Sequence, residues 1–164
     1  SSSSGTSLHK NLENYINGIN EITGNPMSKM MFGLIKTKGL SKLSEAWGTE
    51  VELYYPDLYA GTADLIGVFN GKPAIIDFKN SRRAKKREHI ENYFLQLTAY
   101  AEAHNKLYGT NINCGVILMA SQLGEYQEFI IEGEEFDYYT GKWYNKVYEY
   151  YDKFVLVNKN TTEC

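Results

Sequence analysis

The chain has few of the residues that mark extracellular, membrane-spanning or zinc-binding proteins. Its 164 residues include only two cysteines, Cys114 and Cys164, with no Cys-x-x-Cys spacing. The sequence therefore indicates a reducing compartment and no disulfide framework. The histidines, His9, His89 and His104, are too dispersed for a zinc motif. No apolar run approaches the roughly 20 residues that a membrane-spanning helix needs, so we expect no membrane partner.

Proline is also scarce. Three prolines and 43% hydrophobic residues argue against disorder, and a chain of this length can bury one substantial core. Neither a repeat nor a long linker divides the sequence, so we expect a single domain over residues 1–164. The chain begins with serines rather than methionine. We therefore expect residues to be missing upstream, where a targeting segment would not be visible.

The apolar periodicity predicts an α/β protein. Helical spacing covers residues 8–19, 27–35, 88–107 and 134–154. Strand-like segments cover residues 49–55, 61–69, 72–78, 114–119 and 126–131. The order is therefore helices, strands, a helix, a second hairpin and a final helix.

A predicted hairpin carries the most informative residues. The runs 61–69 and 72–78 are joined by Asn70-Gly71, a strong hairpin signal because both residues tolerate positive φ. Asp64 and Asp77 then lie near one another on adjacent strands. Because side chains alternate along a strand, Asp77 and Lys79 point the same way and Phe78 points into the opposite layer. One face thus presents two carboxylates and an ammonium group.

This combination suits a divalent metal that acts on a phosphodiester. Hard oxygen ligands favour Mg²⁺ or Mn²⁺ over zinc, and magnesium keeps waters that phosphate oxygens can replace. An Asp-x-Lys triplet alone is a weak signal. The alternative interpretation is the exposed polar face of an edge strand.

The helix that follows adds a second polar stripe. His89, Tyr93, Gln96 and Tyr100 fall at i, i+4, i+7 and i+11, so they share one side of a helix. This stripe can face the same cleft as the carboxylates. A solvated surface with amphipathic tyrosines is the alternative.

Several of these elements occur in the order of a known family. Gly5 to Glu13 looks like a first-helix motif with His9 as its histidine, and Gly-Thr-Ala-Asp ends at Asp64. Asp77-Phe78-Lys79 matches a (D/E)xK element, and Gln96 with Tyr100 matches a QxxxY helix. Together they resemble the PD-(D/E)xK nuclease superfamily, in particular its RecB-type exonuclease branch, which includes phage exonucleases. The resemblance covers most of the chain.

The resemblance implies a restriction-endonuclease-like core, with a mixed central β-sheet flanked by α-helices. Asp64, Asp77 and the Phe78 carbonyl are expected to hold Mg²⁺ or Mn²⁺. His9 is expected to bind a second metal or the scissile phosphate.

The other residues of the site are expected to act on water, phosphate or DNA. Lys79 either orients or deprotonates water, or stays protonated and stabilises charge on the phosphate. Gln96 is expected to position water or phosphate, and Tyr100 to support Gln96 or the DNA. Two further carboxylates are additional candidates: Glu13, one helical turn after His9, and Glu50, on the predicted strand 49–55 before the hairpin.

Two departures from the family pattern matter. The acid of the (D/E)xK element is Asp77 rather than glutamate, and its shorter arm requires the metal to sit closer to the strand. Pro56-Asp57 looks like the namesake dipeptide, but the hairpin and the Gly-Thr-Ala-Asp context both select Asp64.

Charge is informative in its distribution and not in its sum. The formal net charge is -3, from 17 basic and 20 acidic residues, so no overall field attracts a polyanion. Residues 79–87, however, hold six basic side chains and no acid. Such a loop can bind a phosphate backbone with salt-dependent affinity, or it is simply solvated. The DNA-binding candidates are Ser81, Arg82, Arg83, Lys85, Lys86 and Arg87.

We therefore predict a metal-dependent DNA exonuclease in replication, repair or recombination, acting on single-stranded DNA or DNA with free ends. The alternatives are a structure-selective endonuclease and a non-catalytic nucleic-acid-binding domain on the same fold. The expected location is the cytoplasm of a bacterial or phage-infected cell, with the mitochondrial matrix as the alternative. The oligomeric state, digestion polarity and activity on RNA stay open.

Overall fold

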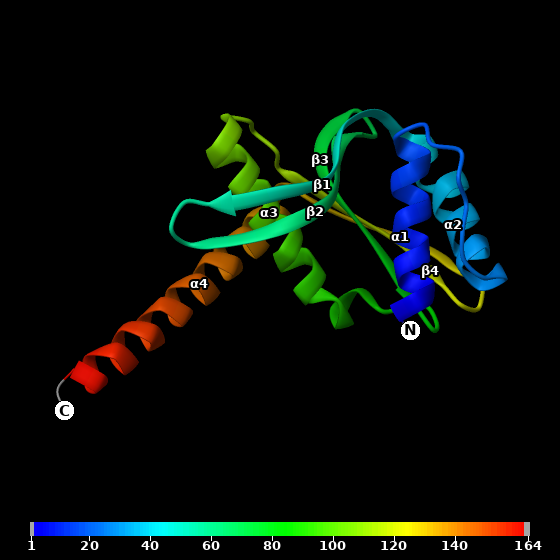
Figure 1. Ribbon diagram of the computed structural model, residues 1–164. Helices are drawn as coiled ribbons and strands as arrows, with labels where there is room; N and C mark the ends of the chain where they lie inside the picture. Colours follow the sequence, from blue (N-terminus) through cyan, green and yellow to red (C-terminus); the bar gives the residue numbers. More distant parts are fainter. Residues whose placement is uncertain (1, 163–164) are drawn as a thin grey trace.

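A computed structural model describes the backbone of residues 2–162 and the side chains of residues 4–154. The helices are α1 (Ser2–Ile16), α2 (Pro26–Lys38), α3 (Glu91–Tyr108) and α4 (Gly133–Thr162), with 3-10 turns η1 (Leu40–Lys42) and η2 (Arg87–His89). The strands are β1 (Leu43–Tyr55), β2 (Tyr59–Phe69), β3 (Lys72–Ser81), β4 (Cys114–Ser121) and β5 (Tyr126–Glu132). The α/β class is confirmed, with a mixed sheet flanked by helices (Figure 1).

The sheet has the strand order β1-β2-β3-β4-β5. Neighbouring strands are antiparallel except β3 and β4, which are parallel because helix α3 connects them. Every residue of β4 is buried. A strand covered by helices on both faces is expected to be apolar along its whole length, as the run from Cys114 to Ala120 is.

Two hydrophobic clusters cover the two faces of the sheet. On one face, Leu8 and Leu12 of α1 and Phe32 of α2 pack against Phe78 and Leu118. On the other face, buried residues of α3 and α4, including Phe94, Leu97 and Tyr139, pack against Ile75 and Ile117. Figure 1 shows α1 and α2 on one side of the sheet and α3 and α4 on the other. Phe78 therefore does point into the layer opposite α3.

The predicted hairpin between β2 and β3 is confirmed. Its turn residues Asn70 and Gly71 have φ angles of 49° and 79°, and Phe69 pairs with Lys72. Two successive positive φ angles define the turn whose twist matches antiparallel strands, and asparagine and glycine adopt them most readily.

The same two strands separate a few residues later. Their ladder runs from Phe69 and Lys72 to Leu65 and Ile76 and then stops. Beyond it, β2 pairs only with β1, and β3 pairs with β4 as far as Ser81. Figure 1 shows the β1–β2 hairpin projecting away from the rest of the sheet. The opening, here called the fork, begins at Asp64 and Asp77.

Some boundaries differ from the sequence prediction. Strand β1 begins at Leu43 rather than residue 49, because register shifts near Glu45 and Ala46 break the alternation that would reveal it. The third helix begins at Glu91, so His89 lies in η2, exposed, and not on the helical stripe. Among the described residues, no helix combines the length and the apolarity needed to cross a membrane.

Candidate active site

Three acidic residues lie in one row across three neighbouring strands. Glu50 falls between Thr49 and Val51, which pair with Leu65 and Ala63, so it lies opposite Asp64. On the other side of Asp64, Leu65 and Ile76 form the last pair of the β2–β3 ladder. Asp64 and Asp77 are the next residues on the two strands, so they lie opposite each other. The sheet therefore brings Glu50, Asp64 and Asp77 together, although their positions in the sequence are well separated.

Asp64 closes the ladder where β2 and β3 separate. Its Oδ2 accepts a hydrogen bond of 2.8 Å from the Phe78 backbone N–H. A side-chain oxygen thus replaces the backbone carbonyl that an unbroken ladder would supply. This bond satisfies a strand N–H that would otherwise be orphaned and fixes the Asp64 carboxylate at the fork.

The Asp64 and Asp77 carboxyl groups contact each other, and their pKa values move apart. Burial, followed by the neighbouring charge of Asp64, raises the pKa of Asp77 to about 7. Burial would also raise the pKa of Asp64, but hydrogen bonds from His9 and Asp77 hold it below its usual range. Two close carboxyl groups resist simultaneous ionisation unless a cation lies between them.

Lys79 is the ammonium group beside this pair. Its Nζ lies 2.8 Å from Asp77 Oδ2 and donates a 3.3 Å hydrogen bond to Gln96 Oε1. It also lies 4.6 Å from the centre of the Tyr93 ring, a cation–π contact. Burial would lower the pKa of Lys79, but Asp77 raises it above its usual value. Lys79 is therefore a charged ammonium group at neutral pH.

Helix α3 supports Lys79 through two further side chains. Gln96 Nε2 donates a 3.1 Å hydrogen bond to the hydroxyl of Tyr100, one helical turn further along. The Tyr100 ring packs against Gly61 so closely that a Cβ at position 61 would lie 2.6 Å from its Cε1. The glycine that begins Gly-Thr-Ala-Asp thus leaves room for the tyrosine that holds Gln96.

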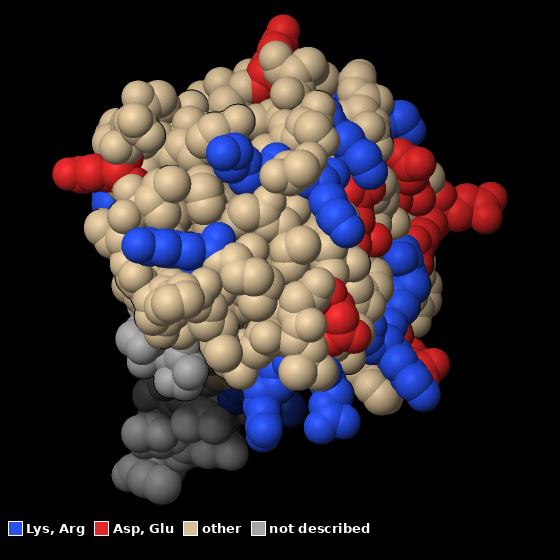
Figure 2. All heavy atoms as spheres, turned by 90° about the vertical axis from the view of Figure 1, so that its right-hand side faces the viewer, with Lys and Arg blue, Asp and Glu red and all other residues tan. Residues whose placement is uncertain are grey.

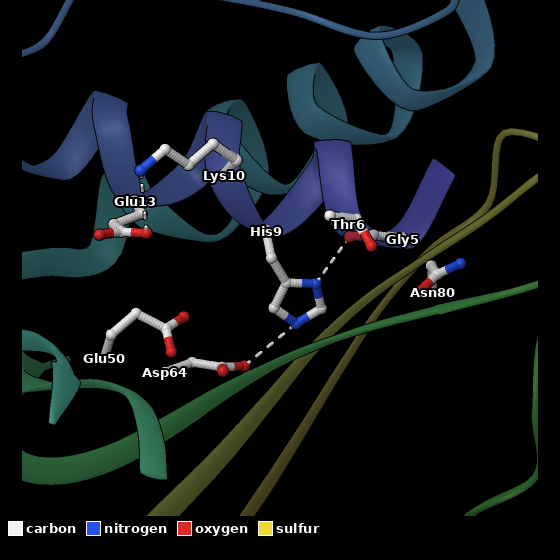
Figure 3. A pocket seen from close by; sticks show the side chains of 8 residues that line it. All are labelled: Gly5, Thr6, His9, Lys10, Glu13, Glu50, Asp64 and Asn80. Atoms are coloured by element: carbon white, nitrogen blue, oxygen red, sulfur yellow. Dashed lines mark hydrogen bonds and ion pairs between the residues drawn. The ribbon is translucent and has the colours of Figure 1, made fainter. Parts of the chain in front are cut away.

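His9 reaches the fork from α1, on the opposite face of the sheet. Its Nδ1 lies 2.9 Å from the Gly5 carbonyl and its Nε2 lies 3.3 Å from Asp64 Oδ2, as Figure 3 shows. Nε2 also lies 2.9 Å from the Phe78 carbonyl. All these neighbours are acceptors, so both ring nitrogens carry protons. The hydrogen bond to Asp64 is the largest of the effects that raise the pKa of His9 to about 9.

An open cleft of about 710 Å³ adjoins His9 and Asp64. Glu13 of α1 and Glu50 of β1 also line it, and Figure 3 shows both carboxylates on the side of the cleft where Asp64 lies. Glu50 has φ of 48°, an uncommon conformation for a residue other than glycine. Burial, followed by the charge of Asp64, raises its pKa. Glu13 and Glu50, the two additional candidate carboxylates, therefore share the cleft with Asp64.

The predicted basic loop divides into exposed and structural side chains. Arg82, Arg83, Lys85 and Lys86 are exposed and make no ion pair within the described part of the chain. Figure 2 shows Lys and Arg side chains projecting along the lower edge of the molecule, the level at which this loop lies in Figure 1. These four side chains are free to meet a phosphate backbone.

The other two candidates in this segment hold the loop in place. The buried Ser81 hydroxyl donates to the Arg83 carbonyl at 2.6 Å. Arg87 pairs with Glu135 and donates to the Ile130 carbonyl, so its guanidinium is engaged within the protein. Sequence alone gave no signal for this, because Glu135 is 48 residues away.

The loop backbone is also tied to neighbouring side chains. Glu125 accepts the Ala84 N–H at 3.0 Å, and Gln127 exchanges hydrogen bonds with the Lys85 backbone. The exposed basic residues therefore project from a braced segment.

The donor set fits a hard divalent cation. Asp77 Oδ2 is buried and accepts no well-directed hydrogen bond from the described residues, since Lys79 meets it only as an ion pair. Asp64 contacts Asp77, and the Phe78 carbonyl lies beside Asp64, since both are within 3.3 Å of His9 Nε2; all three groups are oxygen donors. No ready-made group of three His, Cys, Asp or Glu side chains occurs in the described chain. Water or substrate oxygens would have to complete the coordination, as is common for magnesium.

Two known proteins are similar to this chain in sequence. Over 159 residues the chain is 29% identical to mitochondrial genome maintenance exonuclease 1 of Mus musculus, covering 91% of the chain and 46% of that protein. Over 101 residues it is 31% identical to the Homo sapiens protein of the same name, covering 58% of the chain and 29% of that protein. The chain thus spans less than half the length of either relative. No protein-family model matches it.

A solved structure shares the fold. The crystal structure of a proposed exonuclease from Eubacterium rectale superposes with a TM-score of 0.66 at 15% identity, over 96% of this chain and 68% of that one. This likeness shows the fold. The sequence similarity to the two exonucleases agrees with the resemblance at the level of a nuclease superfamily and does not identify the branch.

Gly61→Ala is expected to slow turnover of a phosphodiester substrate by as much as roughly 100-fold, because the new Cβ displaces Tyr100 and, with it, Gln96. Steady-state kinetics of the purified variant measure this effect. Gly33→Ala is the control: nothing lies within 4 Å of its added Cβ, so turnover should not change. Wild-type turnover in Gly61→Ala would show that the Tyr100 position does not matter.

His9 is expected to make the metal-free protein less stable as the pH rises from 6.5 to about 9. Its folded-state pKa exceeds the ordinary value, so the stabilisation is complete below 6.5 and lost through about 9. Asp77 acts in the same direction at lower pH, between 3.8 and about 7. Urea unfolding in EDTA should show a flatter profile for His9→Asn. Between pH 6.5 and about 9 the control His104→Asn should keep the wild-type slope, because burial lowers the pKa of His104 and the ring is mostly neutral across that window in the folded and the unfolded protein.

Proposed function

We propose that this chain is a metal-dependent nuclease that hydrolyses phosphodiester bonds in DNA, acting on single strands or free ends in replication, repair or recombination. The observation that carries the proposal is the fork, where Asp64 and Asp77 contact each other beside the Lys79 ammonium group. The similarity to exonucleases supports it. The mitochondrial names of these relatives are compatible with the mitochondrial matrix, the alternative compartment.

Asp64, Asp77 and the Phe78 carbonyl are the residues that would hold Mg²⁺ or Mn²⁺. A bound divalent ion supplies Lewis-acid polarisation of the phosphate and a lower pKa for attacking water. Buried carboxylates favour this role because their oxygens are fixed and desolvated before substrate arrives. The Phe78 N–H bond to Asp64 keeps one carboxylate from rotating away.

Lys79 acts best as a cation in this scheme. Its Nζ lies 2.8 Å from Asp77 Oδ2 and donates a hydrogen bond to Gln96 Oε1, so its neighbours hold it as a hydrogen-bond donor. The ammonium group is suited to stabilise negative charge that develops on the phosphate oxygens. Gln96 and Tyr93 hold it in place, so little reorganisation is needed during the reaction.

His9 and the cleft supply the second side of the site. The doubly protonated imidazole carries a positive charge at the cleft, and its Nε2–H would turn from the Phe78 carbonyl and Asp64 to a phosphate oxygen of the substrate, an acceptor of the same kind. Thr6 and Lys10 line the same cleft near His9. His9 therefore contributes to binding the scissile phosphate.

Incubation of end-labelled linear and covalently closed circular single-stranded DNA with the protein and Mg²⁺ tests the proposal. The linear strand should be degraded and the circle spared, and EDTA should stop the reaction. Asp77→Asn should abolish turnover, and Lys79→Met should lower kcat by roughly 100- to 1,000-fold, since the charge stabilisation is lost.

The exposed Lys106→Met serves as the matched control for Lys79→Met and should retain full activity. Turnover in EDTA, or in Asp77→Asn, would contradict the metal mechanism. Cleavage of the circle would instead identify an endonuclease.

The basic loop is expected to set the salt dependence of DNA binding. On single strands the slope of log K against log salt changes by about 0.7 for each phosphate contact, so removing four charges should reduce it by up to roughly 3. The substitutions are to glutamine, at Arg82, Arg83, Lys85 and Lys86. Arg87 is kept because it pairs with Glu135.

Fluorescence anisotropy titrations at several salt concentrations measure the slope. A control variant removes four exposed lysines elsewhere, at Lys29, Lys38, Lys106 and Lys153. If both variants show the same slope, the loop does not contact the phosphate backbone.

A further inference from the structure

Two adjoining hollows extend away from the candidate active site. The first, of about 280 Å³, is lined by Gln96 and Tyr100, and the second, of about 420 Å³, is lined by Tyr150 and Tyr151. They share the side chains of Tyr59, Trp143 and Lys146. We call the combined surface the aromatic groove, formed by Tyr59, Trp143, Lys146, Tyr150 and Tyr151. It begins at the residues that support Lys79 and continues along α4.

The walls of the groove come from segments distant in the sequence. Figure 1 shows α4 leaving the body of the protein past the end of the β1–β2 hairpin. The Tyr151 hydroxyl donates to the Leu58 carbonyl in the hairpin turn. The Tyr59 hydroxyl donates to the Ala99 carbonyl of α3 at 2.8 Å, and its ring meets Trp143 edge to face at 5.0 Å. The aromatic walls are therefore held in place before any ligand arrives.

Two groups of the groove are available to a ligand. Tyr150 lines the second hollow and is 64% exposed. Lys146 is exposed and makes no ion pair among the described residues, whereas Lys142, one helical turn earlier, pairs with Glu91. An exposed aromatic ring beside an unpaired ammonium group is a combination that suits a nucleobase and its phosphate.

We propose that the aromatic groove binds unpaired bases of a single nucleic-acid strand whose backbone passes the fork. The inference rests on the proposed function, since it requires the strand to lie at Asp64 and Asp77. Gln96 and Tyr100 border both the Lys79 network and the groove. A polymer held at the fork therefore brings its neighbouring units to the aromatic side chains.

Bases match the groove for a chemical reason. Every base has a π-face, so stacking on tyrosine or tryptophan tolerates any sequence. In a duplex these faces are already stacked and the edges paired. The groove therefore favours single strands over duplexes without reading their sequence, which gives the nuclease its substrate class.

The test measures binding in EDTA, so that hydrolysis does not interfere. Fluorescence anisotropy compares a labelled oligothymidylate with an abasic oligomer of the same length, which has the same phosphates and no bases. Wild-type protein should bind the oligothymidylate more tightly. Tyr150→Ala should raise its Kd roughly tenfold and leave the abasic oligomer unaffected.

Tyr148→Ala is the matched control, because Tyr148 is 60% exposed on the same helix but does not line either hollow. Its Kd should equal that of the wild type. Equal Kd values for Tyr150→Ala and Tyr148→Ala, or equal wild-type binding of both oligomers, would overturn the inference. So would a blunt duplex that competes as well as a single strand.

Two further measurements separate the explanations. Sedimentation velocity that shows a dimer in the wild type and a monomer in Tyr150→Ala would identify a second copy as the occupant and refute base binding. If the wild type and Tyr150→Ala both degrade linear DNA and bind the oligothymidylate with equal Kd, base binding by the aromatic groove is refuted and the proposed function is not. Absence of hydrolysis by the wild type with Mg²⁺ or Mn²⁺ would instead refute the proposed function, which the binding assay does not test.

Discussion

The hydrogen bond from the Phe78 N–H to the Asp64 carboxylate is the contact on which the site depends. It allows two strands to part without leaving a buried N–H unsatisfied. Beyond this point β3 pairs with β4 alone, so the edge of β3 that faces β2 is no longer closed by a neighbouring strand beside Asp77 and Lys79. Helices from both faces then reach the same point, α1 through His9 and α3 through Gln96.

Burial and charge reinforce each other at this point. Asp77 is 4% exposed and contacts a second carboxyl group, so the negative charge that the pair carries when both groups are ionised is poorly screened by water, an imbalance that raises the pKa of Asp77 to about 7. His9 and Lys79 offset that charge from the two faces of the sheet. A cation placed between the carboxylates would act on the same imbalance, which connects the electrostatics of the resting protein with the metal chemistry proposed for it.

The fold class and most of the central motif were predictable because they depend on local patterns. The Asn70-Gly71 turn and strand alternation brought Asp64 to Asp77 and Lys79 to the side of Asp77, whereas the contact of Asp64 with His9 on the opposite face of the sheet was not predicted. The start of β1 was not predictable, because bulges interrupt its alternation. Likewise, the pairing of Arg87 with Glu135 and the aromatic groove depend on contacts between distant segments, which no local pattern encodes.

The protonated imidazole of His9 gives the resting molecule an internal counter-ion. It contacts Asp64 and the Phe78 carbonyl, two of the groups assigned to a metal. In the proposed nuclease, loss of the metal would therefore leave the carboxyl groups partly neutralised by His9, and they would not repel each other apart. The folded site would then stay in place for a returning ion, so that scarcity of the metal would lower the proposed activity without unfolding the protein.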